Sequence, residues 1–193
     1  MPKLLIATNN PGKLKEIGEI LKNIPYRMIT LKETGITEDI PETGKTFEEN
    51  AVQKARYASE KTQLLTLAED SGLEIDYLKG RPGVRSARYI SGSDEERVNQ
   101  VLKELKRVPV EKRRAKFVAV VALYNPITKQ VITWRGESLG RITEKAVGKG
   151  GFGYDPVFYN FDLGKTNAEA TPEEKNKVSH RSKALHQARI FLK

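Results

Sequence analysis

The sequence predicts an α/β protein built around a central sheet, and three features indicate this class. Short apolar runs typical of buried strands alternate with amphipathic segments typical of helices. The chain opens in the order strand, helix, strand, as a βαβ unit does. The strongly apolar run 117–124 is followed by the turn Asn125-Pro126 and by residues 131–137, which we expect to return as an antiparallel partner.

In the first half of the chain we expect three buried strands and two helices. The strands are Lys3–Thr8, Tyr26–Leu31 and Leu64–Ala68, with a separate alternating strand at Leu73–Leu78. The first helix begins at the cap Asn10 and has Pro11 in its first turn. The second begins at the capping box Thr46-Phe47-Glu48-Glu49 and runs to about Lys61.

In the second half, helices are predicted at the capping box Ser93-Asp94-Glu95-Glu96, at Thr171 with Pro172 in the first position, and at Ser179. Short strands are expected at 141–146 and 157–159. The last helix is predicted to bury one apolar face made of Ala184, Leu185, Ala188 and Phe191.

The bulk composition limits the function classes. The chain has 193 residues, 38% of them hydrophobic, which suits a single domain over 1–193. It has no Cys, no apolar run long enough for a membrane span and no signal-peptide pattern, so we expect a cytoplasmic protein without membrane or disulfide chemistry. The net charge of +9 permits a nucleic-acid-binding module, but the basic residues are scattered and aromatics do not alternate with them.

The segment Gly148-Lys-Gly-Gly-Phe-Gly-Tyr-Asp-Pro156 is the most informative stretch. Glycine lets a backbone approach a ligand or adopt positive φ, and a flexible linker would not carry Phe152 and Tyr154. The segment therefore indicates either a binding surface for a flat polar ligand or a glycine-rich turn with a core aromatic. Both interpretations stay open on this segment alone.

Three further segments place polar groups in loops. Thr8 to Lys13 joins a strand to a helix N-terminus, which suits an anion or simply a capped helix. Glu69-Asp70-Ser71-Gly72 follows a predicted strand and, with Glu42, offers oxygen ligands suited to Mg²⁺, or forms a solvated acidic turn. Lys175 with Ser179-His180-Arg181 offers donors for carbonyl or phosphate oxygens, or a surface pair. Together the segments suggest a nucleotide with Mg²⁺.

The same segments resemble the inosine triphosphate pyrophosphatase (Ham1) family, in order and over nearly the whole chain. The matching motifs are Thr8-x-Asn10-x-x-Lys13, Glu42-Thr43-Gly44, Thr46-Phe47-x-Glu49-Asn50-Ala51 with Lys54, Asp70-Ser71-Gly72-Leu73, Pro82-Gly83, Ser86-Ala87-Arg88, Gly150-Gly151-Phe152-Gly153-Tyr154-Asp155-Pro156 and Ser179-His180-Arg181. The resemblance implies an elongated mixed sheet flanked by helices, in two lobes with a substrate cleft between them.

The resemblance also implies an activity and site residues. The reaction is hydrolysis of ITP, dITP and XTP to the monophosphate and pyrophosphate, by a Mg²⁺-dependent homodimer that cleanses the nucleotide pool. Asp70 corresponds to the general base, and Glu42, Asp70 and Glu69 correspond to metal ligands. The substrate contacts are Thr8, Asn9, Asn10, Pro11, Gly12, Lys13, Lys54, Ser71, Arg88, Phe152, Gly153, Tyr154, Asp155, Lys175, His180 and Arg181.

Within that set, Phe152 corresponds to the residue that stacks on the base, and Asp155, Lys175, His180 and Arg181 to those that read its edge. Two positions depart from the family pattern. Glu69 stands where Asp is common, and Arg85 where Tyr or Phe is common. The alternatives are the nucleic-acid-binding module and a Maf-type pyrophosphatase acting on modified pyrimidine nucleotides.

Overall fold

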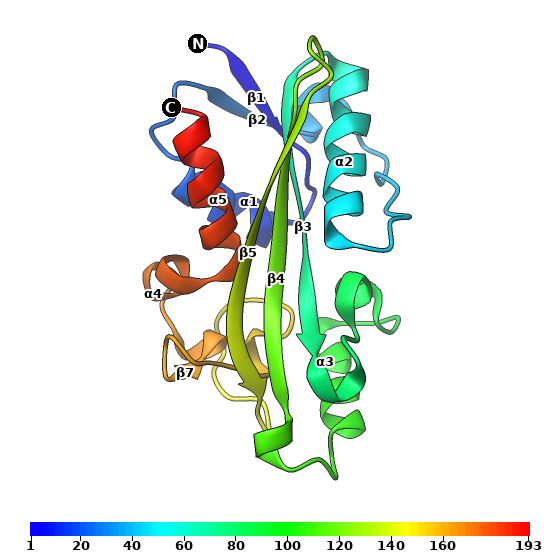
Figure 1. The fold of residues 1–193 in the computed structure, drawn as a ribbon, viewed down its shortest axis with the longest axis vertical. Coiled ribbons are helices and arrows are strands. Elements are labelled where there is room, and N and C mark those ends of the chain that lie inside the picture. Colours follow the sequence, from blue (N-terminus) through cyan, green and yellow to red (C-terminus); the bar gives the residue numbers. More distant parts are fainter. The chain divides into compact units, whose positions relative to one another are not determined.

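The computed structural model describes all residues 1–193 and contains one seven-stranded sheet with the order β2-β1-β3-β4-β5-β6-β7. The strands are β1 (Lys3–Ile6), β2 (Arg27–Thr30), β3 (Leu65–Ile75), β4 (Arg114–Tyr124), β5 (Val131–Ile142), β6 (Phe158–Asn160) and β7 (Lys165–Thr166). The α-helices, drawn in Figure 1, are α1 (Pro11–Ile20), α2 (Phe47–Thr62), α3 (Asp94–Glu104), α4 (Pro172–Val178) and α5 (His180–Phe191). The predicted α/β class with a mixed sheet is confirmed. None of these helices combines the length and apolar content that a membrane span requires.

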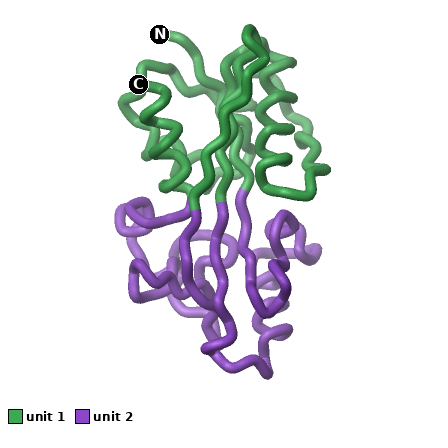
Figure 2. The backbone as a smooth tube through the Cα atoms, in the orientation of Figure 1, with its two compact units in different colours: residues 1–70, 119–136, 181–193 green, residues 71–118, 137–180 purple.

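The chain divides into two compact units, which Figure 2 colours separately. Unit 1 comprises Met1–Asp70, Ala119–Gly136 and Arg181–Lys193, and unit 2 comprises Ser71–Val118 and Glu137–His180. The strands β3, β4 and β5 contribute residues to both units. Two unit boundaries fall at the bonds Asp70–Ser71 and His180–Arg181, and so inside two of the predicted site segments.

Unit 1 contains the predicted βαβ opening. Strand β1 pairs in parallel with β2 and with β3, and Leu4 lies opposite Met28 on one side and Leu65 on the other. Helices α1 and α5 cover one face of this part of the sheet, and α2 covers the other (Figure 1). The core on the α1 and α5 face includes Leu4, Ile6, Ile17, Leu21, Leu67, Val121, Ala184, Leu185 and Ala188. Each large aliphatic side chain buried there stabilises the fold by roughly 1.5–3 kcal/mol.

Unit 2 has its own apolar core, which joins α3 to the sheet. The buried side chains include Leu73, Ile75, Val98, Val101, Leu105, Phe117, Ile142, Tyr154, Val157 and Phe158. The rings of Phe117 and Phe158 are 4.7 Å apart and tilted by 60°, a favourable aromatic arrangement. The predicted capping box at Ser93 is confirmed, and so is the helix start predicted at Thr171, which the structure shows to be a capping box as well.

The helix starts predicted in unit 1 are confirmed, with one difference in detail. The Asn10 side chain accepts the Lys13 amide, and the Thr46 side chain accepts the Glu49 amide. The Glu49 carboxylate, however, accepts the Lys45 amide at 2.5 Å, so the reciprocal half of the expected capping box is made by the neighbouring residue. The Thr46 side chain still accepts an amide of the first turn of α2, which is why the predicted start of the helix is correct.

The prediction that a strand ends at Ala68 is wrong, because β3 runs unbroken from Leu65 to Ile75 through Glu69 and Asp70. Carboxylates usually end a buried strand because their desolvation is costly. Here both are paired with cationic side chains from helices, and this pairing permits the strand to continue. Since successive side chains of a strand point to opposite faces, the two carboxylates cannot form the adjacent pair that the sequence suggested.

Two smaller expectations are also corrected. The strand predicted at 131–137 continues to Ile142 as β5, so the separate strand predicted at 141–146 is wrong: its first two residues belong to β5, and residues 143–146 are not in a strand. Phe191 is 56% exposed, whereas Leu192 is buried in the core, so the apolar face of α5 shifts by one residue at the end of the helix. The Phe191 ring lies against Trp134, with 5.6 Å between ring centres, and this contact gives the exposed ring a partner within unit 1.

Candidate active site

A cluster of buried charges lies on the α2 face of β3 in unit 1. The Asp70 carboxylate, 6% exposed, has the Lys54 ammonium 3.0 Å from Oδ1. The same ammonium lies 2.6 Å from Glu42 Oε1. Lys54 is therefore a cation shared by two carboxylates that come from different parts of the chain.

Burial and charge act against each other in this cluster. Burial raises the pKa of the Asp70 carboxyl above its ordinary value, although Lys54 and Lys13 oppose the rise. Burial alone would lower the pKa of Lys54, but Asp70 and Glu42 raise it above its ordinary value. Lys54 thus stays charged at neutral pH, beside a carboxylate that accepts protons more readily than an exposed aspartate does.

The raised pKa of Asp70 predicts a pH-dependent contribution to stability. From about pH 4 up to the raised pKa, the folded chain holds a proton that the unfolded chain has released. This group therefore makes the free energy of unfolding fall as pH rises through that window. The Asp70→Asn variant lacks this contribution. The free energy of unfolding of the variant minus that of the wild type should therefore increase with pH in urea unfolding series made in EDTA. Parallel profiles for the two proteins would contradict the assignment.

The neighbouring carboxylate, Glu69, lies on the opposite face of β3, toward α1 and α5. Its Oε2 is 3.0 Å from Lys13 Nζ, and its Oε1 is 3.3 Å from Arg181 Nη2. Arg181 also binds Glu16 of α1, at 2.5 Å. Burial lowers the pKa of Lys13, with Glu69 opposing the change. Glu69 thus anchors two cations on the face away from Asp70.

The fit of Mg²⁺ can be judged from these oxygens. No three or more His, Cys, Asp or Glu side chains are arranged to hold a metal ion, so the predicted set of Glu42, Asp70 and Glu69 is not assembled as one group. Mg²⁺ usually takes only one or two carboxylates and completes its shell with water and phosphate. Glu42 and Asp70 fit that pattern, because they already share one cation, Lys54. Glu69 does not fit it.

The strand-to-helix connection at the start of α1 has the features of an anion site that the sequence predicted. Asn10 accepts the Lys13 amide at 3.0 Å and donates its own amide to Thr8 Oγ1 at 3.2 Å. Asn9, Asn10 and Pro11 are exposed, and Gly12 is partly exposed. The backbone amides of this connection precede Lys13 in the chain, and the Lys13 ammonium is paired with Glu69.

In unit 2 the glycine loop is ordered around Asp155, which is 2% exposed. Asp155 Oδ2 accepts the Phe152 amide at 3.0 Å and the Lys175 ammonium at 2.6 Å. The Lys175 Nζ also lies 4.8 Å from the centre of the Phe152 ring. A Cβ at Gly151, whose φ is +73°, would meet Asp155 Oδ2 at 2.1 Å, so this position requires glycine. These contacts of Asp155 and Lys175 hold Phe152 in place within the loop.

The other predicted residues of unit 2 differ in burial: Tyr154 and His180 lie in its interior, whereas Ser71, Arg88 and Gly153 do not. Tyr154 is buried, and its hydroxyl donates to the Ser86 carbonyl at 2.8 Å. The buried His180 ring stacks on Phe117, with 4.8 Å between ring centres. The Gly153 amide donates to Asp94 of α3 at 2.8 Å. Ser71 is partly exposed and Arg88 is exposed.

The structure therefore brings the predicted residues together in three groups. Unit 1 holds two of them, one on each face of β3: Lys54 joins Glu42 and Asp70, and Glu69 joins Lys13 and Arg181. Unit 2 joins Phe152, Asp155 and Lys175. His180 and Arg181 are sequence neighbours but belong to different units.

Sequence reasoning missed two buried amides that organise these groups. Asn50 of α2 donates to Asp70 Oδ2 at 3.1 Å, and Asn167 donates to Asp155 Oδ1 at 3.0 Å. Each side chain is 1% exposed. Asn50 lies in the quoted motif Thr46 to Ala51, but the motif does not indicate a contact twenty residues away. Asn167 has no local signal.

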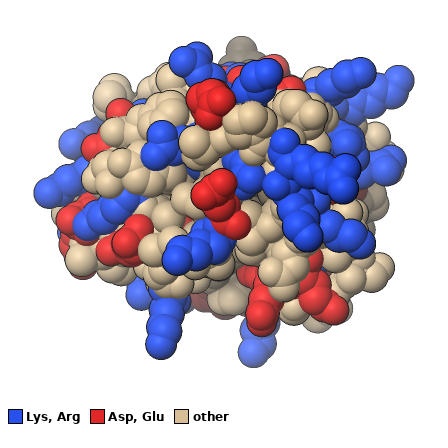
Figure 3. Space-filling model, turned by 90° about the horizontal axis from the view of Figure 1, so that it is seen from below, with Lys and Arg blue, Asp and Glu red and all other residues tan.

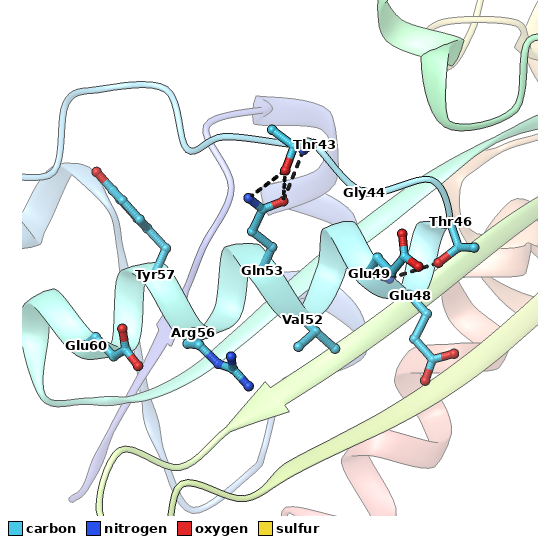
Figure 4. Close-up of a pocket in the computed structure, with 10 residues that line it drawn as sticks. All are labelled: Thr43, Gly44, Thr46, Glu48, Glu49, Val52, Gln53, Arg56, Tyr57 and Glu60. Carbon is cyan, nitrogen blue, oxygen red and sulfur yellow. Dashed lines mark hydrogen bonds between the residues drawn. The ribbon is translucent and has the colours of Figure 1, made fainter.

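A groove of unit 1 runs along α2. It has a volume of about 810 Å³, and its lining includes Thr43, Gly44 and Gln53 (Figure 4). The Gln53 side chain accepts the Thr43 amide at 3.1 Å, as the dashed lines show. None of the predicted site residues lines this groove, so the groove and the charge cluster are separate features.

Comparison with known proteins assigns the sequence and the fold to one family. The sequence profile of the Ham1 family matches residues 4–191. The chain belongs to the Ham1 family. It is 47% identical to the dITP/XTP pyrophosphatase of Symbiobacterium thermophilum over 95% of this chain and 91% of that protein. It is also 47% identical to the dITP/XTP pyrophosphatase of Bacillus subtilis, over 96% and 94% of the two chains.

Solved structures give the same result for the fold. A HAM1 protein from Coxiella burnetii matches with a TM-score of 0.91 and 40% identity, covering 100% of this chain and 98% of that one. The Ham1 protein of Staphylococcus aureus matches with a TM-score of 0.88 and 38% identity, over 98% and 97% of the two chains. The resemblance inferred from the sequence motifs is confirmed.

Proposed function

We propose that this protein hydrolyses the non-canonical purine nucleoside triphosphates ITP, dITP and XTP to the monophosphate and pyrophosphate. The observation that carries the proposal is the buried Asp70 carboxylate beside the shared cation Lys54. Attack of water on a phosphoryl group needs a proton acceptor and positive charge at the phosphate oxygens, and this pair supplies both. The names of the relatives, which match over nine tenths of their length, support the same reaction.

In unit 1, Asp70 is the proposed general base, and it takes the proton of the attacking water. The ammonium groups of Lys54 and Lys13 offset the negative charge of the phosphates. The amides at the start of α1, from Thr8 to Gly12, bind phosphate oxygens. Glu42 and Asp70 would hold Mg²⁺, which neutralises phosphate charge and acidifies bound water when present. In this scheme Glu69 is an anchor for Lys13 and Arg181 rather than a metal ligand.

In unit 2, the Phe152 ring is the proposed stacking surface for the base. Lys175 and His180 are the proposed donors to the 6-oxo edge of hypoxanthine or xanthine. A 6-amino group cannot accept a hydrogen bond as an oxo group does, and sites built on such bonds reject an analogue by roughly 10⁴-fold. Asp155 is assigned to holding Phe152 and Lys175 in place, because its oxygens bind those groups.

The alternatives receive less support. On the face drawn in Figure 3, Lys and Arg side chains are interspersed with Asp and Glu, which is unlike a continuous basic nucleic-acid surface. The match to the Ham1 family over residues 4–191 argues against a Maf-type enzyme. We further propose a homodimer that acts in the cytoplasm, where the nucleotide pool is found, and size-exclusion chromatography with light scattering tests the dimer.

A panel of nucleoside triphosphates tests the activity. With Mg²⁺ we expect pyrophosphate release from ITP, dITP and XTP, and roughly 10³- to 10⁴-fold lower kcat/KM for ATP. Addition of EDTA is expected to abolish the release. Equal turnover of ATP, or orthophosphate as the product, would refute the proposal.

A further inference from the structure

We propose that Asn50 is a positioning residue that fixes the direction of the Asp70 carboxylate and ties it to the loop Glu42–Gly44. The inference rests on the proposed role of Asp70 as the general base. Asn50 touches no reacting atom in this scheme, so it acts through Asp70. Asn50 lies in the motif Thr46 to Ala51, but the sequence assigned no role to it.

The orientation of the Asn50 side chain follows from its two partners. Its Oδ1 lies 2.8 Å from the Gly44 amide, and its Nδ2 lies 3.1 Å from Asp70 Oδ2. A backbone N–H can only donate, so the side-chain oxygen must face Gly44. The side-chain NH₂ group then faces the carboxylate, which can only accept when it is ionised. The Asn50 side chain is 1% exposed, the bond to Asp70 is buried and the bond to Gly44 is partly buried, so an unmade bond there is costly.

Asn50 and Lys54 hold the two oxygens of Asp70 separately. Lys54 is bound to Oδ1 at 3.0 Å, and Asn50 is bound to Oδ2 at 3.1 Å. The two residues are four apart on α2, so their side chains lie on the same face of the helix. With a donor at each end, the carboxylate cannot rotate about its χ2 without losing a bond. Its remaining lone pairs are thereby aimed in one direction.

The same two side chains also reach the loop that carries Glu42. Lys54 binds Glu42 itself at 2.6 Å, and Asn50 binds the Gly44 amide two residues later. A Cβ at Gly44 would lie 2.7 Å from Asn50 Oδ1 and 2.6 Å from Glu49 Cβ, so only glycine lets this amide come so close. Asn50 thus links the base to the loop that presents Glu42.

The loop offers a matched control. Gln53, also on α2, accepts the Thr43 amide at 3.1 Å. It contacts the residue next to Gly44 and makes no recorded bond to Asp70. Removing Gln53 therefore tests the loop attachment alone, whereas changing Asn50 tests the link to the base.

The test compares Asn50→Asp with Gln53→Ala. An aspartate at position 50 can still accept the Gly44 amide but cannot donate to Asp70. We expect kcat for ITP to fall about 10- to 100-fold, as for loss of a hydrogen bond to a charged group, with KM changed less than about threefold. Gln53→Ala should keep kcat within about twofold of wild type.

Amide hydrogen exchange gives a second reading that does not depend on turnover. In Asn50→Asp the Gly44 amide should stay protected while kcat falls; in Gln53→Ala the Thr43 amide should lose protection while kcat is kept. Unchanged kcat in Asn50→Asp, or an equal loss of kcat in both variants, would overturn the positioning role.

Should Asn50→Asp fail to fold, the wild type and Asp70→Asn suffice. The NMR signals of the Asn50 side-chain NH₂ group should shift when Asp70 loses its charge, and unchanged signals would overturn the link. If the wild-type protein releases no pyrophosphate from any nucleotide, the proposed function is rejected instead. The NMR measurement does not depend on turnover, so it tests the contact between Asn50 and Asp70 separately.

Discussion

Asp70→Asn is expected to lower kcat for ITP hydrolysis by about 10³-fold, within the range that a general base contributes. The amide has nearly the same volume but cannot take the proton of the attacking water. Its oxygen can still accept a hydrogen bond from Lys54 or Asn50, the two donors that hold Asp70. KM should therefore change much less than kcat. Pyrophosphate release measured against ITP concentration separates the two constants.

The control for this variant is Asp39→Asn. Asp39 is exposed in the same unit, in the loop that leads to Glu42, and its loss of charge should leave kcat within about twofold, as for most surface substitutions. Thermal unfolding of both variants checks that each is folded. If Asp70→Asn keeps more than a tenth of the wild-type kcat, Asp70 is not the base. The proton acceptor that works beside Lys54 would then be a different group.

The fold could be predicted from the sequence wherever a local pattern decides the structure. The cap Asn10 with Pro11 and the capping box at Ser93 fix helix starts through bonds within four residues. The apolar run 117–124 is predicted as a strand from its own composition, and it forms most of β4. The parallel pairing of β1 with β2 follows from the short helix that joins them.

The prediction failed where distant residues decide the structure. Glu69 and Asp70 look like the end of a strand, because the sequence does not show Lys13, Lys54 and Arg181 neutralising them. Once they are neutralised, β3 continues, and the two carboxylates belong to different faces. The motif match predicts a site role for both Asp70 and Glu69, but it does not show that the Glu69 side chain lies on the other face of the sheet, where it binds Lys13 and Arg181.

The glycine loop and its buried partners show that local sequence patterns do not reveal contacts between distant residues. The sequence of the glycine loop is compatible with a binding surface or with a turn that has a core aromatic, and the structure shows a core aromatic in it. Tyr154 is a core residue, whereas Phe152 is partly exposed. The buried partners of Asp155, above all Asn167, have no local signature because their contact depends on how residues 155–175 fold back.

Lys175→Met is expected to lower the free energy of unfolding by about 3–5 kcal/mol, the cost of leaving a buried charge without its partner. Lys175 and Asp155 are 2.6 Å apart, with side chains 7% and 3% exposed. Urea unfolding measures the change, and Lys177→Met is the control, because Lys177 is exposed on the same helix, α4. That control should stay within about 0.5 kcal/mol of wild type.

The double variant Asp155→Asn with Lys175→Met separates the lone charge from the lost contact. Without a carboxylate there is no unpaired charge, so most of the lost stability should return, although the Phe152 amide keeps only a neutral acceptor. Binding should not return, because Lys175 is the cation 4.8 Å from the Phe152 ring and the proposed donor to the base. We therefore expect KM for ITP to be raised in Lys175→Met and to stay raised in the double variant. A recovery of KM together with stability would show that Lys175 serves the fold alone.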